Sequence, residues 1–409
     1  MKILIIGSGG REHALAWRFA EEGHTISAAP GNPGIARLGE IVASTDYLAV
    51  AECLRADLTV VGPEGPLASG IVDEFRQRGL AIFGPTREMA RLEASKIYSK
   101  TFMQRLAIPT ARFVQSPSSD DAIAALARFD YPVVVKADGL ATGKGVIIAA
   151  DRAQAESAVR TLGPQLVIEE FLEGEEVSFI VISDGRGVVA FEATQDHKAV
   201  GDGDTGPNTG GMGAYCDGRI LTSADSQRIL DTIIAPVIHT TSFTGFLYAG
   251  LMMTADGPKV LEFNVRLGDP ETQPLMHRLA PQSGLADVLM RAATGSLAGA
   301  SLQWTPDPSV CVVLAAQGYP GKVRTGDAIT GIDNAMGDCG AQIFQGGTKL
   351  GAQGLETSGG RVLGVTTSGP DLRSAVANAY AAVARIQFNG MHYRRDIAQK
   401  GLKRWPAEN

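Results

Sequence analysis

Short apolar runs alternate with helix-like patterns along the first hundred residues. The runs at residues 2–6, 58–61 and 80–83 each lead into a turn rich in glycine or proline, and an amphipathic helical pattern follows the first of them. Strands that alternate with helices form open parallel sheets, which bind ligands at the carboxyl ends of their strands. The pattern therefore predicts an N-terminal Rossmann-like parallel sheet domain.

The pattern changes beyond Tyr131, where apolar runs follow one another as in a hairpin. Predicted strands lie at residues 133–136, 146–149, 166–170, 177–183, 246–253 and 259–266. After Pro306 and Pro308, a predicted linker, come strands at 310–315 and 360–366 and an alanine-rich helix at 371–386. The chain is thus predicted to be an α/β and α+β multidomain protein with an α+β centre and a small C-terminal α/β domain.

Composition and charge narrow the range of functions. The 409 residues include 37 Lys and Arg against 44 Asp and Glu, so no basic field exists to hold a nucleic-acid backbone. The apolar run before Gly7 is too short for a signal peptide, and no apolar run reaches the roughly 18 residues of a membrane span. The four cysteines lack metal-binding spacing. We expect a cytoplasmic protein that binds neither nucleic acid nor membrane.

Residues 7–12 begin like a dinucleotide-binding fingerprint. Glu12, however, occupies the place of the third glycine, and no acidic residue ends the second strand, which disfavours a nicotinamide-dependent oxidoreductase. Backbone N–H groups at the start of the following helix, beside Arg11 and His13, suit a phosphate or another anion. A tight turn without any ligand explains the same residues equally well.

A second glycine-rich segment, residues 138–145, follows a strand that ends with Lys136. Its glycines allow close backbone approach and Lys144 can reach a phosphate, but Gly145 stands where a Walker loop needs Ser or Thr. This combination predicts a flexible lid over a triphosphate. An ordinary mobile hairpin with surface lysines is the alternative.

The strand at residues 259–266 carries the most informative pattern. Side chains alternate between two faces, so one face should carry Leu261, Phe263 and Val265. The other should carry Glu262, Asn264 and Arg266. A carboxylate and an amide oxygen about 6.6–7 Å apart along a strand can share one hard cation such as magnesium. A half-exposed strand with solvated polar residues is the alternative.

Residues 201–215 are predicted to form a long loop with few apolar anchors. Loops of this length are usually functional or disordered. His197, just before it, is expected to be a structural hydrogen-bonding residue and not a catalytic base.

Taken together, these motifs closely resemble the glycinamide ribonucleotide synthetase family of ATP-grasp enzymes. The resemblance spans almost the whole chain and rests on residues 7–14, 61–64, 136–140, 169–176, 195–198, 207–215 and 266–271. It implies an N-terminal substrate domain (1–98), an ATP-grasp domain (99–308) with a lid subdomain (about 110–171), and a C-terminal domain (309–409). It also implies ATP-dependent ligation of glycine to 5-phosphoribosylamine through glycyl phosphate in purine biosynthesis, by a monomer or weak dimer.

The resemblance further implies roles for individual residues. Those expected at the nucleotide are Lys96, Lys136, Asp138, Gly139, Gly143, Lys144, Gly145, Glu169, Glu170, Phe171, Leu172 and Glu176. Those expected around glycine and phosphoribosylamine are Gly9, Arg11, Glu64, Asn208, Thr209, Gly210, Gly211, Met212, Gly213, Arg266 and Asp269. Catalytic roles are implied for Lys136, Arg266, Asp196 and Lys198, and magnesium or manganese is expected on Glu262 and Asn264.

Two other interpretations stay open from the residues alone. One is a different ATP-grasp enzyme, either another carboxylate ligase or a carboxylase. The other is a nucleotide-sensing module that binds ATP without turnover. Substrate-dependent release of ADP separates these possibilities.

Overall fold

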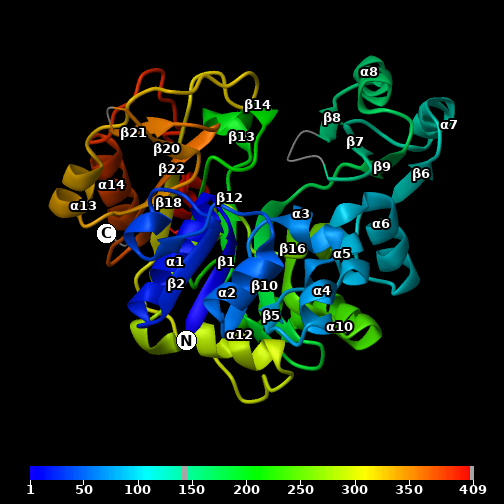
Figure 1. Ribbon diagram of the computed structural model, residues 1–409. Helices are drawn as coiled ribbons and strands as arrows, with labels where there is room; N and C mark the ends of the chain where they lie inside the picture. Colours follow the sequence, from blue (N-terminus) through cyan, green and yellow to red (C-terminus); the bar gives the residue numbers. More distant parts are fainter. Residues whose placement is uncertain (141–144, 353, 406–409) are drawn as a thin grey trace.

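The computed structural model describes residues 1–140, 145–352 and 354–405. Gly143 and Lys144, predicted to lie in a lid loop, fall outside these residues. The N-terminal part lies between two lobes, one built around β6–β9 and the other from the C-terminal part (Figure 1). Within the described ranges, no helix combines the length and apolarity needed to cross a membrane.

The N-terminal part is a five-stranded sheet with all strands parallel and the order β3-β2-β1-β4-β5. This confirms the predicted Rossmann-like architecture. The strands are β1 (Lys2–Gly7), β2 (Thr25–Pro30), β3 (Glu40–Ile41), β4 (Leu58–Val61) and β5 (Ile82–Phe83). The helices that follow them are α1 (Gly10–Glu21), α2 (Tyr47–Leu54), α3 (Glu64–Ser69), α4 (Ile71–Gln77), α5 (Arg87–Ala94) and α6 (Lys96–Arg105).

A separate antiparallel sheet of order β6-β9-β7-β8 forms one lobe of the molecule (Figure 1). Its strands are β6 (Phe113–Ser116), β7 (Val133–Ala137), β8 (Val146–Ala149) and β9 (Leu166–Glu170). The sheet and its two helices, α7 (Ser119–Ala125) and α8 (Arg152–Leu162), enclose their own small apolar core. The predicted hairpin is present, because β7 and β8 pair antiparallel.

The largest sheet runs from the centre of the chain into its C-terminal part without a break. Its order is β17-β16-β10-β12-β15-β18-β22-β19, and β15 pairs with β18 across the predicted linker. The strands are β10 (Glu175–Asp184), β12 (Thr194–Asp196), β15 (Gly213–Cys216), β16 (Thr244–Thr254), β17 (Gly257–Asn264), β18 (Ser309–Ala315), β19 (Gln342–Gln345) and β22 (Arg361–Ser368). The C-terminal part therefore shares a sheet with the centre, which the sequence pattern did not indicate.

Helices and short strands complete the fold, and one of the short strands, β11 (Val188–Ala190), belongs to the large sheet because it pairs with β10. The helices are α9 (Ser223–Ile229), α10 (Ala235–Thr241), α11 (Thr272–Arg278), α12 (Leu285–Ala293), α13 (Ile332–Cys339), α14 (Leu372–Val383) and α15 (Gln399–Arg404). The short strands are β11 (Val188–Ala190), β13 (Ala199–Gly201), β14 (Thr205–Asn208), β20 (Thr348–Gly351) and β21 (Gly354–Thr357).

The expectation of a long loop at residues 201–215 is wrong in part. Strands β13 and β14 form a small antiparallel hairpin there, and β15 belongs to the large sheet. Arg394, 1% exposed, holds the hairpin from the C-terminal side through Asp204 at 2.8 Å and the carbonyl of Ala199 at 3.2 Å. Long-range ion pairs thus replace the apolar anchors that the segment lacks.

A β-bulge changes the predicted faces of β17. Gly250 lies opposite Glu262 and Leu251 opposite Val260, so Leu261 is the extra residue. Val260, not Leu261, shares the core with Phe263 and Val265. The expectation that Leu261 points into this core is therefore wrong: it packs instead on Ala111, Leu172 and Met252.

Candidate functional site

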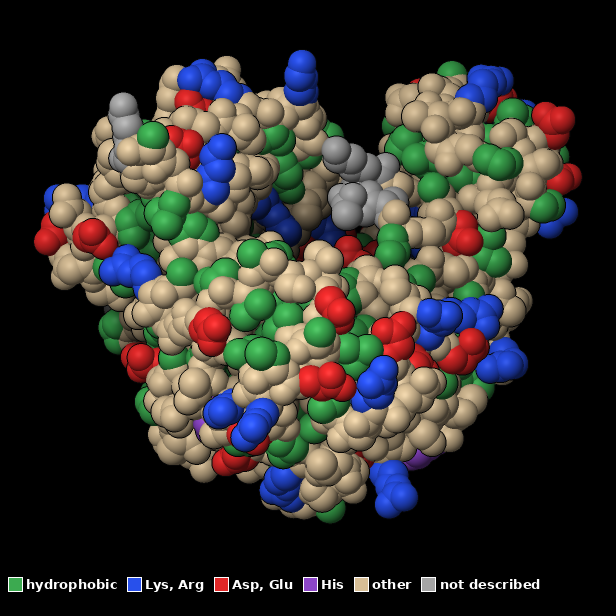
Figure 2. Space-filling view, in the orientation of Figure 1, with side chains coloured by type: hydrophobic (Ala, Val, Ile, Leu, Met, Phe, Trp, Pro, Cys, Tyr) green, Lys and Arg blue, Asp and Glu red, His purple; other side chains and the backbone are tan. Residues whose placement is uncertain are grey.

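A cleft of about 720 Å³ lies between the lobe of β6–β9, the large sheet and the N-terminal part. Figure 2 shows it as a hollow between the two upper lobes, with charged side chains on its floor. The floor is one face of the large sheet, where Ser178 lies opposite Gly250 and Gly250 opposite Glu262. Tyr248 lies opposite Asn264 on the same face. Three neighbouring strands thus bring polar residues that are distant in sequence onto one surface.

One wall of the cleft, here called the lysine wall, contains Lys96, Lys100, Lys136 and the buried carboxylate of Glu169. Glu169 pairs with Lys136 at 3.0 Å and with Lys100 at 3.1 Å, and all three side chains line the cleft. Burial lowers the pKa of Lys100 to about 8 and also lowers the pKa of Lys96. The wall therefore carries a net positive charge suited to phosphate, and Glu169 fixes the position of two of its cations.

The glycine-rich loop starts beside helix α6. Asp138 Oδ1 accepts hydrogen bonds from Ser95 Oγ at 3.0 Å and from the backbone N–H of Ile97 at 3.1 Å. It does not line the cleft and instead caps α6, while Lys96 Nζ donates to the carbonyl of Gly139 at 2.8 Å. Gly139 and Gly145 line the cleft.

The rim of the cleft combines apolar side chains with exposed backbone. Leu140, Ile148 and Phe171 line it and stay 45%, 50% and 38% exposed, and Leu172 is buried beside them. Glu170 turns away from them, since its carboxylate accepts a hydrogen bond from the backbone N–H of Arg112 at 2.8 Å. Exposed apolar side chains inside a cleft suit a flat, apolar group such as a nucleobase.

Lys198 lies between two carboxylates on the floor. Its Nζ is 2.6 Å from Glu176 Oε2 and 2.9 Å from Asp196 Oδ1. Burial opposes the charge on Lys198, but the Asp196 and Glu176 carboxylates outweigh it and hold its pKa well above the ordinary value. Burial raises the pKa of Asp196 to about 6. His197 faces the opposite way and is structural, with Nε2 accepting from the N–H of Ala398 at 3.3 Å and burial lowering its pKa to about 4.

Glu262 and Asn264 lie side by side as predicted, with Oε1 and Nδ2 3.5 Å apart, and both line the cleft. Asn264 Oδ1 accepts from Arg266 Nη2 at 3.2 Å and keeps a second lone pair. A carboxylate and a carboxamide oxygen fit a hard cation that also takes phosphate oxygens and water. No group of three or more His, Cys, Asp or Glu side chains within residues 1–140, 145–352 and 354–405 could hold a metal by itself.

Arg266 is held from two sides by the N-terminal part. Its Nη2 pairs with Glu93 at 2.8 Å and its Nε with Glu64 at 3.5 Å. Burial opposes its charge, but Glu93 and Glu64 outweigh this and raise the pKa of Arg266 further. Arg11 also lines the cleft and donates to the carbonyl of Leu267 at 3.0 Å.

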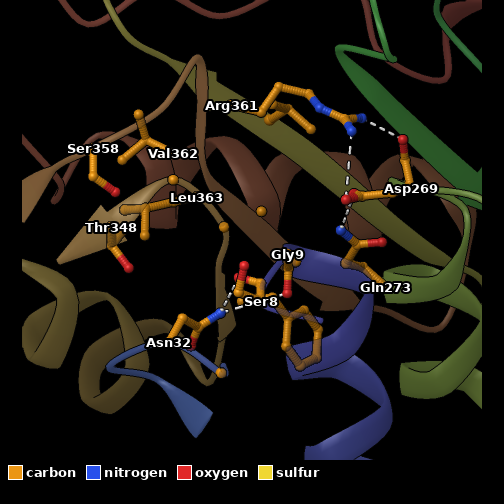
Figure 3. A pocket seen from close by; sticks show the side chains of 17 residues that line it. Ser8, Gly9, Asn32, Asp269, Gln273, Thr348, Ser358, Arg361, Val362 and Leu363 are labelled. Atoms are coloured by element: carbon orange, nitrogen blue, oxygen red, sulfur yellow. Dashed lines mark hydrogen bonds and ion pairs between the residues drawn. The ribbon is translucent and has the colours of Figure 1, made fainter. Parts of the chain in front are cut away.

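A second cavity of about 390 Å³ lies between the first glycine turn and the C-terminal part (Figure 3). The start of α1, with Gly9 and Gly10, forms one wall, and Asn32 Nδ2 holds the turn by donating to the carbonyl of Ser8 at 2.8 Å. Asp269 and Arg361 lie opposite, 3.4 Å apart. These two residues line both cavities, so the cleft and the second cavity adjoin each other at this ion pair.

The loop after β14 is divided between the site and the core. Asn208, Thr209 and Gly210 line the cleft, and Arg361 Nη1 donates to the carbonyl of Gly210 at 2.6 Å. Gly211, Met212 and Gly213 line neither cavity. Met212 is fully buried, and a side chain at Gly211, whose φ is +114°, would collide with Pro270.

Several site residues escaped the sequence interpretation. They are Asn32, Glu93, Lys100, Tyr319 and Arg361. Lys100 lies one helical turn after Lys96 on α6, so the two lysines share one face of the helix. This spacing could have indicated from the sequence that Lys100 belongs to the site. Arg361 and Tyr319 come from the C-terminal part, whose contact with the centre depends on the shared sheet.

Comparison with known proteins agrees with this architecture. Models of the phosphoribosylglycinamide synthetase N domain, ATP-grasp (A) domain and C domain match residues 1–93, 94–272 and 309–400. The chain thus contains an ATP-grasp domain between two further domains of one enzyme type. It belongs to the phosphoribosylglycinamide synthetase family.

Relatives and solved structures support this assignment. The phosphoribosylamine–glycine ligase of Ralstonia nicotianae is 48% identical, covering 99% of this chain and 100% of the relative. That of Pseudomonas aeruginosa is 46% identical over 100% of both chains. The crystal structure of the Thermotoga maritima phosphoribosylamine–glycine ligase matches with a TM-score of 0.85 at 34% identity, covering 97% of this chain and 100% of that one.

More distant structures share the fold alone. The biotin carboxylase domain of Hydrogenobacter thermophilus 2-oxoglutarate carboxylase, solved with MgADP and bicarbonate, matches with a TM-score of 0.70 at 17% identity, covering 96% of this chain and 91% of that one. A likeness of this kind extends to carboxylases, so the fold by itself does not choose the substrate.

Replacing Lys100 by Met should weaken ATP binding at least about tenfold, because a buried cation facing the phosphates is lost. In the unmodified protein, ATP affinity should fall as pH rises through about 8, where Lys100 loses its proton. The variant should lack this decline. Calorimetric titration with ATP and magnesium at pH 7, 8 and 9 measures both effects. Lys349→Met, at an exposed lysine, is the control, and a pH-independent affinity in the unmodified protein would contradict the assignment.

Proposed function

We propose that this protein ligates glycine to 5-phosphoribosylamine, forming glycinamide ribonucleotide, ADP and phosphate in purine biosynthesis. The observation that carries this proposal is that two cavities adjoin each other at Asp269 and Arg361. One cavity has a lysine wall and an acid–amide pair, as a nucleotide triphosphate requires, and the other has a helix N-terminus and an arginine, as a phosphate ester requires. Both substrates of a ligation can therefore meet.

The chemistry starts from a poor electrophile. Glycine's carboxylate does not lose oxygen, but transfer of the γ-phosphoryl group of ATP makes glycyl phosphate, from which phosphate leaves when the ribosylamine nitrogen attacks. Lys136, Lys100 and Lys96 hold the triphosphate, and Arg266 adds positive charge where two anions meet. Magnesium or manganese on Glu262 and Asn264 would neutralise the phosphate oxygens. Positioning replaces a protein nucleophile in this reaction.

The two cavities divide the substrates between them. The larger cleft takes ATP, with adenine against Leu140, Ile148 and Phe171, the ribose at Glu176, and glycine over the floor. The smaller cavity takes phosphoribosylamine, with its phosphate at the start of α1 and at Arg361. Asp196 and Lys198 lie on the floor, beside the amine and the carboxyl group that react.

The proposal also includes the domain boundaries, the oligomeric state and the cellular compartment. We take residues 1–98, 99–308 and 309–409 as the three domains, with a lid subdomain over about 110–171. We further propose a monomer or weak dimer in the cytoplasm.

An ADP-coupled assay with glycine and freshly generated phosphoribosylamine tests the function. ADP release should require both compounds and should stop when either is omitted. Release with bicarbonate or another carboxylate in place of glycine would favour a different ATP-grasp enzyme. ATP binding without any amine-dependent release would favour a nucleotide-sensing module.

Replacing Glu262 by Ala should lower kcat by about a thousandfold or more, because the metal-bearing carboxylate is lost while the strand keeps its pairing. The thermal unfolding midpoint should stay close to that of the unmodified protein. Asp256→Ala, at an exposed acid in the turn of the same hairpin, should change neither quantity. Unchanged activity of Glu262→Ala at saturating magnesium would reject the role of this residue.

Replacing Arg361 by Gln should raise KM for phosphoribosylamine about 10- to 100-fold, because a charge-assisted phosphate contact is lost. KM for ATP should change less than about twofold. Steady-state kinetics with each substrate varied in turn give both values, and Arg324→Gln, at a half-exposed arginine on the C-terminal part, is the control. Equal increases in both KM values would argue against the division of substrates between the cavities.

A further inference from the structure

The carboxylates of the cleft differ in how their charge is balanced. Most of those that line it have an Arg or Lys partner, namely Glu64, Glu93, Glu169, Glu170, Glu176, Asp196 and Asp269. Among the described residues, Glu262 and Glu271 line the cleft without such a partner. Glu262 is exposed and belongs to the acid–amide pair, whereas Glu271 is 4% exposed and has no role in the chemistry above.

Glu271 is held in place by hydroxyl groups and not by a cation. Tyr248 Oη donates to Glu271 Oε1 at 2.6 Å, Ser178 Oγ lies 2.7 Å from Tyr248 Oη, and Ser178 Oγ donates to the same Oε1 at 3.4 Å. Burial and the Glu271 carboxylate raise the pKa of Tyr248 well above its ordinary value, so the phenol stays protonated and keeps donating.

The second oxygen of Glu271 is open toward the cleft. No hydrogen bond to Oε2 exists in the part of the chain that the structure describes. Gly268 leaves this oxygen uncovered, because a side chain at that position would collide with it. A carboxylate oxygen that is open in this way can accept a hydrogen bond from a ligand, and a cationic donor also balances the buried charge.

The network lies on the floor of the cleft, next to the acid–amide pair. Tyr248 lies directly opposite Asn264, and such cross-strand neighbours have Cβ atoms about 4.5–5.5 Å apart. Gly250 lies opposite Glu262, and a Cβ there would make ordinary contact with Glu262 Cγ at 3.4 Å and Tyr248 Cε2 at 3.8 Å, so the glycine leaves room for about one small group between them. A small molecule lying over Gly250 would have the acid–amide pair on one side and Glu271 on the other.

We propose that Glu271 binds the ammonium group of the amino-acid substrate, with Tyr248 and Ser178 fixing its carboxylate. This inference rests on the proposed function, in which the carboxyl group of glycine is phosphorylated beside Glu262 and Asn264. The ammonium group takes no part in that chemistry. Its recognition therefore acts on binding and orientation, and it selects an amino acid over a carboxylic acid that lacks the amine.

Replacing Glu271 by Gln keeps the shape and removes the charge. KM for glycine should rise about 30-fold or more, because a buried charged partner is lost, while KM for ATP should change less than about twofold. Glycolate, which carries a hydroxyl in place of the ammonium, is the second probe. The preference of the unmodified enzyme for glycine over glycolate, measured as the ratio of kcat/KM values, should shrink by a similar factor in the variant.

Tyr248→Phe provides a second variant that keeps the charge of Glu271. It should raise KM for glycine about tenfold, because one hydrogen bond to a charged group is lost. If Glu271→Gln does not fold, Tyr248→Phe tests the inference by itself. Glu173→Gln, at an exposed acid outside the cleft, is the matched control. An unchanged glycine KM and an unchanged preference over glycolate in the folded variants would overturn the inference while the proposed function stands. Absence of glycine-dependent ADP release in the unmodified enzyme would overturn both.

Discussion

The geometry of the site depends on two ion pairs, which join Arg266 to Glu64 and to Glu93. The arginine lies two residues after β17, the strand that carries the acid–amide pair, and both carboxylates come from helices of the N-terminal part. Glu93 also accepts the backbone N–H of Val265 at 2.8 Å, so it fixes the chain as well as the side chain. Loss of one partner of a buried pair typically costs about 3–5 kcal/mol, because the other charge stays buried. These ion pairs join α3 and α5 to the chain that follows β17, and Arg11 joins the start of α1 to the same segment through the carbonyl of Leu267.

The second constraint is the sheet that the central and C-terminal parts share. Pairing of β15 with β18 places Arg361, at the start of β22, beside Asp269 and the loop after β14. A C-terminal domain joined only by a linker would hold Arg361 less firmly, since domain interfaces in one chain commonly allow relative motion. The continuous backbone hydrogen bonding therefore makes the junction between the two cavities rigid. Chemistry that needs two substrates to meet benefits directly from this rigidity.

Local features of the site could be predicted from the sequence, whereas features set by distant contacts could not. Alternation along one strand placed Glu262 and Asn264 together correctly, because that relation depends on two neighbouring peptide units. The position of Leu261 was wrong because a bulge depends on the partner strand, which the sequence of one strand does not reveal. Arg361 was missed for a similar reason, since its place follows from pairing between strands far apart in the chain. Asp138, expected at the nucleotide, caps helix α6, a contact that its position after β7 does not indicate.

Charge balance explains how such a site accepts anions and a zwitterion without binding them indiscriminately. Lys136 and Lys100 share Glu169, and Lys198 is held between Asp196 and Glu176, so each cation is fixed before any ligand arrives. Preorganised charges interact strongly with a ligand because little reorganisation is needed. Among the described residues that line the cleft, Glu262 and Glu271 are the carboxylates without an ion-pair partner, and in our proposal they receive the positive charges of the metal and of the substrate. In that proposal glycine has its ammonium group at Glu271 and its carboxyl group near Glu262. It can then lie in only one direction, which presents the carboxyl group to the triphosphate.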